Sequence, residues 1–280
     1  MSRHSIESGY ISDEEKTFTT EKIIKEDAKR FQKNFTIEEE LIKSANGVIY
    51  SGFELSSGEP AIFKQIPKTS INNFVSYKGR QIPSEIFYHL KAAEASEAVV
   101  KIIDFFERKS SYVLVMEKLE NVTDLYEFVG EMGPLSEEAA LFIFQQVIEA
   151  ISELAEAGIS HRDIKDENIL INRETLQVFI IDFGCASQTG LSSNPCGTPE
   201  YWAPEVFTET EVESEITDCW ALGAVFYIML TGSWKFENNK VTRNFVLEQH
   251  LSENIVTVFD RLFHANPACR LYLSDLINMF

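Results

Sequence analysis

The N-terminal part of the chain carries short apolar runs with the composition of β-strands. Residues 35–42, 47–54 and 60–66 are rich in β-branched and aromatic side chains, and VVKIIDFFER and SYVLVMEKL continue the pattern. A single helical pattern, IPSEIFYHLKAAEA at 82–95, lies among them. The first 117 or so residues are therefore predicted to form mostly sheet with one main helix.

From about residue 120 onwards the pattern changes to helices. The strongest is the amphipathic stretch 136–158, which Ser136 should cap and Gly158 should end. Helical patterns return at 216–231, 242–250, 252–264 and 271–279. The plausible connector is KLENVT at 118–123, and no internal repeat is visible. The sequence predicts an α+β architecture in which a β-rich lobe is joined to an α-rich lobe.

Residues 1–34 precede these patterns and have a different character. The first 20 are rich in Ser, Thr and acids, which is typical of a disordered tail. Over residues 20–34, Ile23, Ile24 and Phe31 recur at helical spacing. We expect a flexible acidic and polar N-terminal extension that contains a short docking helix.

The composition is that of a globular protein with a strongly acidic surface. Of the 280 residues 44% are hydrophobic, enough for a sizeable core. Acids outnumber bases 44 to 25, so the net charge is −19. Such a chain attracts basic partners and binds nucleic acid and anionic membranes poorly, although the charge could also serve only as a solvated surface.

The location of the protein is constrained by its apolar runs and its cysteines. The longest run, WALGAVFYIML at 220–230, is too short to span a bilayer, and the first 20 residues lack a signal peptide's apolar core. The four cysteines (Cys185, Cys196, Cys219 and Cys269) are widely spaced and contain no CxxC pair. We therefore expect reduced thiols and a monomeric protein of the cytoplasm or nucleus that binds no membrane.

The residues that indicate chemistry lie in HRDIKDENIL at 161–170 and in IIDFGCAS at 180–187. Transfer of a phosphoryl group from a nucleotide needs a carboxylate to orient the incoming hydroxyl, a cation beside the moving phosphate and oxygen ligands for Mg²⁺. These stretches supply such groups in Asp163, Lys165, Asn168 and Asp182. A further lysine, Lys64 in AIFK, can reach the α- and β-phosphates if Glu85 holds it.

These stretches resemble the motifs of the eukaryotic protein kinases. HRDIKDEN is similar to the catalytic loop HRDxKxxN, IDFG to the metal-binding DFG motif, and WAPE at 202–205 to the APE triplet. The resemblance covers about residues 35–280, with the motifs in the family's order. It implies the bilobal kinase fold with ATP in the cleft. The implied parts are an N-lobe over 35–117, a hinge over 118–123 and a C-lobe over 124–280.

The resemblance assigns roles to the C-lobe motifs. Asp163 would be the catalytic base, with Lys165 beside the transferred phosphate. Asn168 and Asp182 would bind Mg²⁺, and Thr198 would pack near Asp163 at the substrate site.

Three further features have a structural role in the family. Asp218 would support the catalytic loop, Arg270 would pair with Glu205, and Lys64 would pair with Glu85. Lys64–Glu85 and Asp218 could also be structural ion pairs that an inactive relative has kept.

The resemblance also implies how ATP is held. Met116 would flank the adenine pocket, and Leu119 stands where the Pim kinases have a proline. Because Leu119 keeps its N–H, adenine could be held by two backbone bonds. Besides Lys64, Glu85, Asp182, Met116 and Leu119, the implied ATP-binding residues are Ile42, Ser44, Gly47, Ile49, Ala61 and Glu117.

The substrate class follows from a closer resemblance. Lys165 and GTPEYWAPE are similar to serine/threonine kinases, and KDEN and SYVLVMEKLENVTDLYEFVG are similar to the Pim and PAS-domain branch. That group holds substrate arginines with acids, which match Asp124 and Glu167 here, with Asp166 a weaker candidate. Asp124 could also be a helix N-cap, and the two roles can coexist. The resemblance implies a Mg²⁺- and ATP-dependent serine/threonine kinase for arginine-rich proteins.

The stretch ELIKSANGVIYSG at 40–52 departs from the family's glycine-rich phosphate loop. Aligned on VIYSG, the fingerprint GxGxxG becomes Ile42-x-Ser44-x-x-Gly47, so two glycines are replaced. Loss of one charged backbone contact costs on the order of 1.5–3 kcal/mol, or about 10- to 150-fold in affinity or rate. The sequence predicts an active enzyme with weakened ATP binding.

A second departure is His89, which replaces an apolar residue expected next to Phe183 and His161. It is either an ordinary buried, hydrogen-bonded histidine or a group that makes the active state pH-sensitive. The altered loop and His89 favour an alternative function, a pseudokinase that acts as a binding or scaffold module for a basic partner.

The segment between Gly184 and Gly197 contains no Asp or Glu that could pair with Arg162. Phosphorylation of Thr189, Ser192 or Ser193 would supply the missing charge. Otherwise Arg162 stays unpaired and the segment is held by other means. Cys185, directly after the DFG motif, is interpreted as a packing residue rather than as a redox switch.

Overall fold

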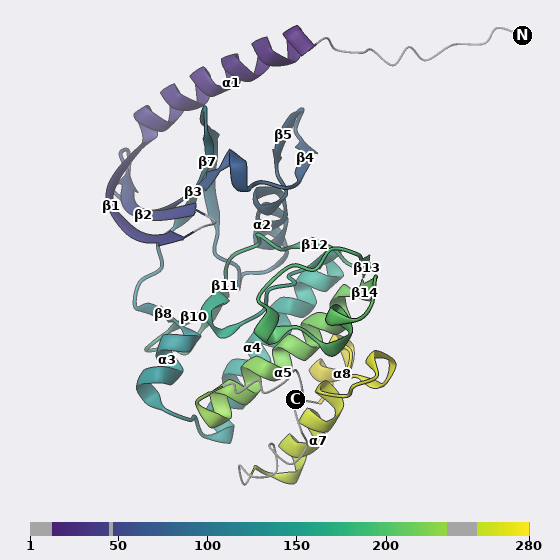
Figure 1. The fold of residues 1–280 in the computed structure, drawn as a ribbon. Helices are drawn as coiled ribbons and strands as arrows, with labels where there is room; N and C mark the ends of the chain where they lie inside the picture. The colour runs from purple at the N-terminus through teal and green to yellow at the C-terminus, as the bar shows by residue number, and fades with distance from the viewer. Residues whose placement is uncertain (1–12, 45–46, 234–250, 280) are drawn as a thin grey trace, which may run out of the picture. The chain divides into compact units, whose positions relative to one another are not determined.

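The computed structural model describes residues 13–44, 47–233 and 251–279. The chain divides into two compact units: unit 1 comprises Met1–Asn72 and Ile102–Lys118, and unit 2 comprises Asn73–Lys101 and Leu119–Phe280. A β-sheet dominates the described part of unit 1 and helices dominate that of unit 2 (Figure 1). The predicted bilobal α+β architecture is therefore confirmed.

Unit 1 is built on a five-stranded antiparallel sheet with the strand order β1-β2-β3-β7-β6. Its strands are β1 (Phe35–Ser44), β2 (Gly47–Glu54), β3 (Pro60–Pro67), β6 (Ile102–Glu107) and β7 (Ser111–Glu117), and a 3₁₀ turn over Lys68–Ser70 follows β3. The strands lie where the apolar runs predicted them. Gly52 lies so close to β1 that a Cβ there would be 2.0 Å from the carbonyl oxygen of Thr36, so only glycine fits.

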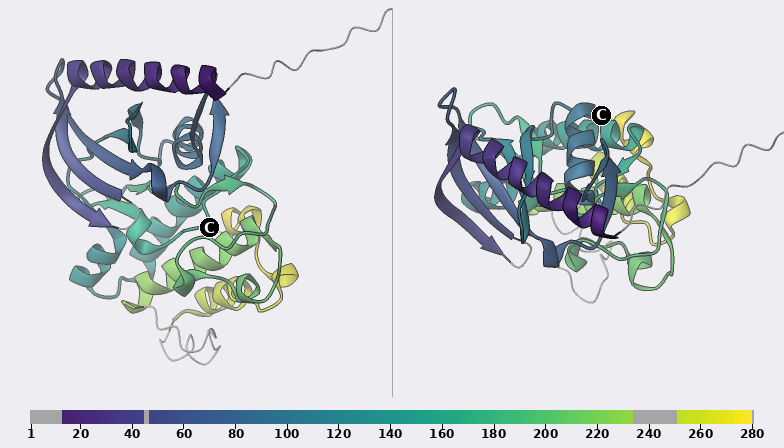
Figure 2. Two further views of the ribbon diagram at one scale, coloured as in Figure 1. Left: turned by 45° about the horizontal axis from the view of Figure 1, so that its top comes forward. Right: turned by 90° about the horizontal axis from the view of Figure 1, so that it is seen from above.

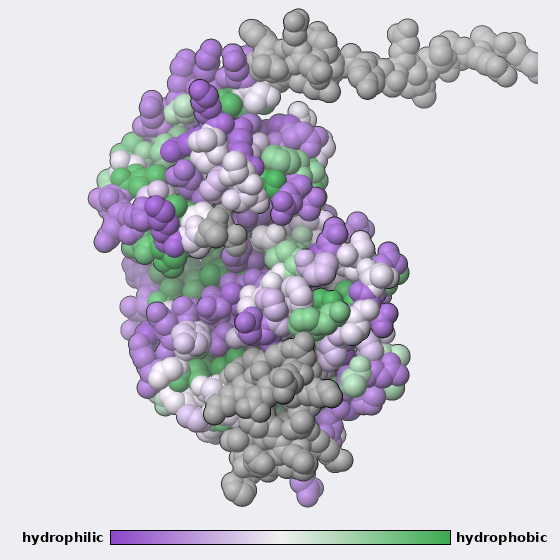
Figure 3. All heavy atoms as spheres, viewed as in Figure 1, coloured by the Kyte–Doolittle hydropathy of each residue, from purple (hydrophilic) through white to green (hydrophobic). Residues whose placement is uncertain are grey.

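Helix α1 (Asp13–Asn34) lies across the sheet of unit 1 and is longer than the helix predicted over 20–34 (Figure 2). Phe31 in its last turn packs against Phe63 of β3 and Phe106 of β6, with ring centroids 5.9 and 5.2 Å apart. Arg30 donates to both carboxylate oxygens of Asp104, each at 2.9 Å. On the face drawn in Figure 3, the coloured part of α1 is mainly hydrophilic. The C-terminal half of α1 therefore contributes to the core of unit 1.

Unit 2 starts with a hairpin that the sequence analysis did not predict. Strands β4 (Phe74–Tyr77) and β5 (Arg80–Pro83) are joined by Lys78 and Gly79, whose φ angles of 48° and 79° match a tight two-residue turn. Helix α2 (Ser84–Ala95) follows directly and starts two residues later than predicted, because the end of β5 occupies those positions. The available signal was Gly79, because glycine adopts the positive φ that such a turn requires.

Five further helices lie in the described part of unit 2. They are α3 (Leu125–Met132), α4 (Glu137–Glu156), α5 (Ser214–Thr231), α7 (Glu253–Leu262) and α8 (Leu273–Ile277). Ser136 caps α4 as predicted, because its hydroxyl accepts a hydrogen bond of 3.3 Å from the Ala139 N–H. Gly158 follows the end of α4 with a φ of 76°. The helix predicted over 242–250 lies outside the described residues.

Short strands and 3₁₀ turns lie between the helices of unit 2. A three-stranded sheet has the order β11-β10-β8, and two-stranded ladders pair β9 with β12 and β13 with β14. The strands are β8 (Val122–Asp124), β9 (Ile159–Ser160), β10 (Ile169–Asn172), β11 (Val178–Ile180), β12 (Ser187–Gln188), β13 (Leu191–Ser192) and β14 (Val212–Glu213). The 3₁₀ turns are Asp166–Asn168, Pro199–Tyr201, Pro204–Phe207 and Pro267–Cys269.

Helix α5 is buried along most of its length and forms the centre of the core of unit 2. Phe226 of α5 stacks on Phe144 of α4 with ring centroids 4.2 Å apart. The predicted pair of Arg270 and Glu205 is confirmed, with two buried hydrogen bonds of 2.5 and 3.0 Å. Within the part of the chain that the structure describes, no helix has the length and apolarity needed to cross a membrane.

Candidate active site

The catalytic loop runs from His161 to Asn168 and is held by Asp218 of α5. The Asp218 carboxylate accepts hydrogen bonds from the backbone N–H groups of His161 and Arg162, at 3.0 and 2.9 Å. Arg162 has a φ of 64°, a left-handed conformation in which two successive N–H groups point to one anion. Burial raises the pKa of Asp218 to about 7, although the two backbone donors act against the rise. The predicted support of the loop by Asp218 is confirmed.

Asp163 is oriented by two groups, one from each side of its carboxylate. Oδ1 accepts a 2.8 Å hydrogen bond from the Thr198 N–H, and Oδ2 accepts a 3.1 Å bond from Asn168 Nδ2. Asn168 Nδ2 also donates to the backbone carbonyl of Asp163 at 2.8 Å. The carboxylate thus has a fixed orientation, which a group that accepts a proton from a substrate hydroxyl needs.

Asn168 and Asp182 supply the oxygens expected of a Mg²⁺ site. Both hydrogen bonds from the Asn168 side chain to Asp163 are donated by the amide nitrogen. Neither bond uses the amide oxygen of Asn168. Asp182 has a φ of 63°, and its Oδ1 accepts a 3.1 Å bond from the Gly184 N–H. A Cβ on Gly184 would lie 3.1 Å from this oxygen and 3.8 Å from Oε2 of Glu85. The Glu85 and Asp182 carboxylates therefore both border Gly184.

The donor set fits Mg²⁺ better than a metal held by the protein alone. Among the described residues, no group of three or more His, Cys, Asp or Glu side chains could hold a metal ion. Mg²⁺ is commonly held by one or two protein oxygens together with water and substrate phosphates. One carboxylate and one amide oxygen, from Asp182 and Asn168, match that pattern.

Lys165 lies among carboxylates. Its Nζ is 2.8 Å from Oε2 of Glu167. Burial works against its charge, but the hydrogen bond with Glu167 and the negative charges of Asp163 and Asp182 raise the pKa of Lys165 overall. Lys165 is therefore a cation close enough to Asp163 and Asp182 for their charges to stabilise it.

Phe183 of the DFG motif lies between two histidines, as the sequence predicted. Its ring centroid is 4.8 Å from that of His89, in a stacked arrangement, and 5.0 Å from that of His161. His89 is buried, and its Nε2 is 2.7 Å from the Val100 carbonyl oxygen. The interpretation of His89 as a buried, hydrogen-bonded histidine is confirmed. Burial lowers the pKa of His161, so its neutral form is favoured.

The three acids considered for substrate arginines differ in their surroundings. Asp124 caps α3 by accepting a 2.7 Å bond from the Glu127 N–H, as the structural alternative predicted. Burial raises the pKa of Asp124, and the negative charges of Glu127 and Glu167 add to the rise, while the backbone bonds oppose it. Glu167 is exposed. Asp166 is buried and accepts a 2.6 Å bond from the Tyr201 hydroxyl, so it does not present a carboxylate to a substrate.

The residues of unit 1 that the resemblance assigned to ATP lie on neighbouring strands. Lys64 of β3 lies opposite Ile49 of β2 and Leu114 of β7 in register, and Glu117 ends β7. Met116 lies opposite Ile62 of β3. Since side chains alternate along a strand, Ile62 and Lys64 share one face of the sheet.

The position of Ala61 corrects the predicted set of ATP-binding residues. It is fully buried and belongs to the hydrophobic cluster of Phe31, Phe63 and Phe106, on the opposite face of β3 from Lys64. Ile62 is therefore the residue of β3 that accompanies Lys64. The sequence AIFK places residues on both faces of β3. The prediction assigned Ala61 to the face of Lys64, because the apolar layer that Phe31 contributes to the other face was not known.

The altered phosphate loop is the connection between β1 and β2. Ser44 pairs with Gly47, and the Ser44 hydroxyl donates to the Gly47 carbonyl at 3.2 Å. Gly47 has a φ of 151°, and a Cβ there would lie 2.3 Å from the Gln65 carbonyl oxygen. The retained glycine is thus required by the close approach of β3. Ile42 is 59% exposed.

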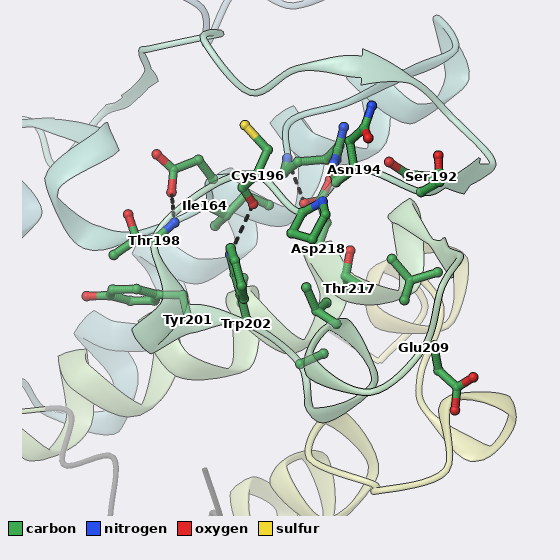
Figure 4. A pocket seen from close by; sticks show the side chains of 18 of the residues that line it. Ile164, Ser192, Asn194, Cys196, Thr198, Tyr201, Trp202, Glu209, Thr217 and Asp218 are labelled. Carbon is green, nitrogen blue, oxygen red and sulfur yellow. Dashed lines mark hydrogen bonds between the residues drawn. The ribbon is translucent and has the colours of Figure 1, made fainter. Parts of the chain in front are cut away.

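The segment from Asp182 to Glu205, called the activation segment below, departs from the prediction for its cysteines and from one of the two alternatives for Arg162. Cys185 and Cys196 form a disulfide, so the expectation of reduced thiols and of a packing role for Cys185 was wrong for this pair. Cys219 and Cys269 are free. Arg162 is not unpaired, because its Nη2 donates to the backbone carbonyl of Asn194. Figure 4 shows this region, with Trp202 Nε1 donating to the Cys196 carbonyl at 3.0 Å.

Comparison with known proteins agrees with this geometry. The family described as protein kinase domain matches residues 35–279 of the chain. Because the match includes most of the sequence, the chain belongs to the protein kinase family, and its relatives are of the serine/threonine type.

Several curated kinases are similar to the chain. Serine/threonine-protein kinase pim-2 of Danio rerio is 32% identical over 220 residues, which cover 75% of this chain and 71% of the relative. Serine/threonine-protein kinase prk-2 of Caenorhabditis elegans is 30% identical over 213 residues, 75% of this chain and 48% of the relative. The mouse PAS domain-containing serine/threonine-protein kinase is 31% identical over 241 residues, 83% of this chain and 17% of the relative. The chain thus spans from about a sixth to about seven tenths of the length of these proteins.

Proposed function

We propose that the protein is a Mg²⁺- and ATP-dependent serine/threonine kinase that phosphorylates basic, arginine-rich proteins. The observation that carries this proposal is the orientation of Asp163 by Thr198 and Asn168. A carboxylate held on both sides, in a loop that also carries Lys165, is the arrangement that proton transfer from a substrate hydroxyl requires.

The reaction would use the described groups of unit 2 as follows. Asp163 would orient the substrate hydroxyl and accept its proton, while the ammonium of Lys165 would offset charge on the transferred phosphoryl group. Asn168 and Asp182 would hold Mg²⁺, which supplies positive charge to the phosphate oxygens when it is bound. For Lys165 to act in this way, its ammonium has to contact the phosphate as well as Glu167.

Nucleotide binding is the second part of the proposal. Lys64 would bind the phosphates with Glu85 as its partner, and Met116 with the hinge residues Glu117 and Leu119 would hold adenine. Ile42, Ser44, Gly47 and Ile49 would form the remaining nucleotide contacts, with Ile62 in place of Ala61. The division into an extension over 1–34, an N-lobe over 35–117, a hinge over 118–123 and a C-lobe over 124–280 stays a prediction. The monomeric state and the cytoplasmic or nuclear location also stay predictions.

Asp124 and Glu167 would select basic substrates. Burial is the main cause of the raised pKa of Asp124, and the negative charges of Glu127 and Glu167 add to it. A substrate guanidinium would offset the repulsion among these carboxylates. The net charge of −19 would favour the approach of basic proteins.

The test is phosphate transfer from Mg²⁺-ATP to a serine peptide with upstream arginines, compared with the same peptide carrying alanines there. Asp163→Asn should abolish transfer. Asp124→Asn keeps the helix cap but removes the charge, so it should lower kcat/KM for the arginine peptide by about 10- to 150-fold and leave the alanine peptide unchanged. Glu149→Gln, an exposed acid on α4, is the matched control.

A pseudokinase that binds a basic partner is the second candidate, favoured by the two glycines missing from the β1–β2 connection. A thermal shift separates the two, because nucleotide at 100 times its dissociation constant adds about 2.7 kcal/mol of stability. Folded protein that neither transfers phosphate nor is stabilised by millimolar Mg²⁺-ATP would support the pseudokinase.

A further inference from the structure

The activation segment contains a covalent closure in addition to its hydrogen bonds. The Cys185–Cys196 disulfide joins residues separated by 11 positions, so it closes a loop that includes Thr189, Ser192 and Ser193. Within the loop, β12 pairs with β9 and β13 pairs with β14. The bridge therefore fixes the two ends of a loop whose middle is held by only short ladders.

Both ends of the bridge lie next to groups of the active site. Cys185 follows Gly184, whose N–H donates to Asp182. Cys196 precedes Thr198 by two residues, and the Thr198 N–H is one of the two donors that orient Asp163. The Cys196 carbonyl also accepts the Trp202 Nε1–H bond shown in Figure 4. A constraint on the two sulfurs thus acts one residue from Gly184, which donates to Asp182, and two residues from Thr198, which donates to Asp163.

No acidic side chain of the loop holds the loop in place. The sequence between Gly184 and Gly197 contains no acid, and Arg162 donates to the neutral backbone carbonyl of Asn194. A neutral acceptor gives a weaker bond than a carboxylate or a phosphate would. Among the described contacts, the disulfide is therefore the covalent link that holds the two ends of the loop together.

We propose that Cys185 and Cys196 form a reversible redox site whose disulfide holds the activation segment in the arrangement that supports Asp163. Formation would proceed by thiol–disulfide exchange with a low-molecular-weight disulfide. The two cysteine thiols lose two protons and two electrons, the Sγ–Sγ bond forms, and the small disulfide is reduced to two thiols. Excess small thiol or dithiol reverses the reaction.

The surroundings of the cysteines agree with exchange at this pair. Cys185 and Cys196 are both half-buried, so a small thiol can approach them. Cys219 is fully buried, and burial raises the pKa of its thiol, which keeps it in the unreactive protonated form. Cys269 is exposed but lies outside the loop, so it provides a matched control.

The first experiment does not depend on catalysis. The full chain is equilibrated in glutathione buffers of increasing oxidised fraction, its thiols are alkylated, and the Cys185–Cys196 bridge is quantified by peptide mass spectrometry. Hydrogen exchange of residues 186–197 is then compared between oxidised and reduced protein. We expect the bridge to form and to slow exchange of the loop by at least about tenfold, because it removes chain freedom from the open loop.

Three controls make this result specific. Cys185→Ser and Cys196→Ser should show the fast exchange of the reduced protein under all conditions, whereas Cys269→Ser should behave as wild type. Thiols that stay reduced in strongly oxidising glutathione buffer would overturn the proposal. So would a bridge that forms without any change in the exchange of the loop.

The second experiment rests on the proposed function. Phosphate transfer to the arginine peptide is measured for the oxidised and the reduced wild type, and kcat/KM should be about tenfold higher for the oxidised form. Equal or higher activity of the reduced form would overturn the link to Asp163. Absence of transfer from both forms, with the difference in hydrogen exchange intact, would contradict the proposed function while supporting the structural role of the bridge.

Discussion

The hydroxyl of Tyr201 donates a hydrogen bond of 2.6 Å to the carboxylate of Asp166. This bond links the segment after Thr198 to the catalytic loop. Asp166 is 2% exposed, and burial raises its pKa although the bond from Tyr201 acts to lower it. The acid that the sequence offered as a weak substrate contact is therefore a structural group of the catalytic loop.

Removal of this hydroxyl should destabilise the protein. Tyr201→Phe leaves this buried carboxylate oxygen of Asp166 with a 3.1 Å hydrogen bond from the Glu167 N–H among the described contacts. We expect a loss of about 1–3 kcal/mol in the free energy of unfolding, measured by urea denaturation. Tyr126→Phe, at a side chain that is 64% exposed, is the matched control and should change stability little. Equal stabilities of the two variants would show that the bond to Asp166 contributes nothing.

Glycines restored to the altered phosphate loop should strengthen ATP binding. The double variant Ile42→Gly and Ser44→Gly removes an exposed apolar side chain and frees the backbone to approach a phosphate. Each regained contact is worth about 1.5–3 kcal/mol, so the KM for ATP should fall by about tenfold or more. Leu41→Gly, at the neighbouring exposed position of β1, carries the same glycine cost of about 0.5–1 kcal/mol without restoring the fingerprint. A KM unchanged from wild type in the double variant would mean that these positions do not contact the nucleotide.

The candidate catalytic groups could be identified from the sequence because their chemistry depends on residue type and spacing. Asp163 and Asn168 lie in one short motif and Asp182 in another, and the loop that carries Asp163 and Asn168 is fixed by Asp218 from a helix with its own motif. The support by Asp218 and the Arg270–Glu205 pair could be inferred for the same reason.

Three features could not be predicted, because they depend on how separate segments meet. The face of β3 that Ala61 occupies is decided by aromatic rings from α1 and β6, not by the AIFK pattern itself. The disulfide depends on the course of the activation segment, since two cysteines 11 positions apart indicate no particular distance. The partner of Arg162 is a backbone carbonyl, which every residue possesses, so no sequence signal could identify Asn194.

The buried Asp218 should make stability depend on pH. Its pKa is raised to about 7 in the folded protein, whereas an unperturbed aspartate has a pKa near 3.9. Between these values the folded chain keeps a proton that the unfolded chain releases, so the free energy of unfolding falls as the pH rises. The slope is at most about 1.4 kcal/mol per pH unit and ends above the folded pKa.

Comparison with Asp218→Asn isolates this contribution. The stability difference between wild type and the variant should decline from about pH 4 to about pH 7 and then level off, because asparagine does not titrate. Urea unfolding at several pH values measures it. Glu149→Gln, which removes an exposed carboxylate, should keep the wild-type slope. A difference that is constant with pH would show that Asp218 does not titrate in this range.

The last prediction concerns the contact of α1 with the sheet of unit 1. Phe31 is 8% exposed and touches the rings of Phe35, Phe63 and Phe106. Truncation of a buried phenylalanine costs about 3–5 kcal/mol, so Phe31→Ala should lower the free energy of unfolding by that amount and speed hydrogen exchange in α1 and β6. Phe74→Ala removes the same side chain at a position that is 46% exposed and should cost much less. If both variants lose the same stability, or if exchange in β6 does not change, then α1 is not part of the core of unit 1.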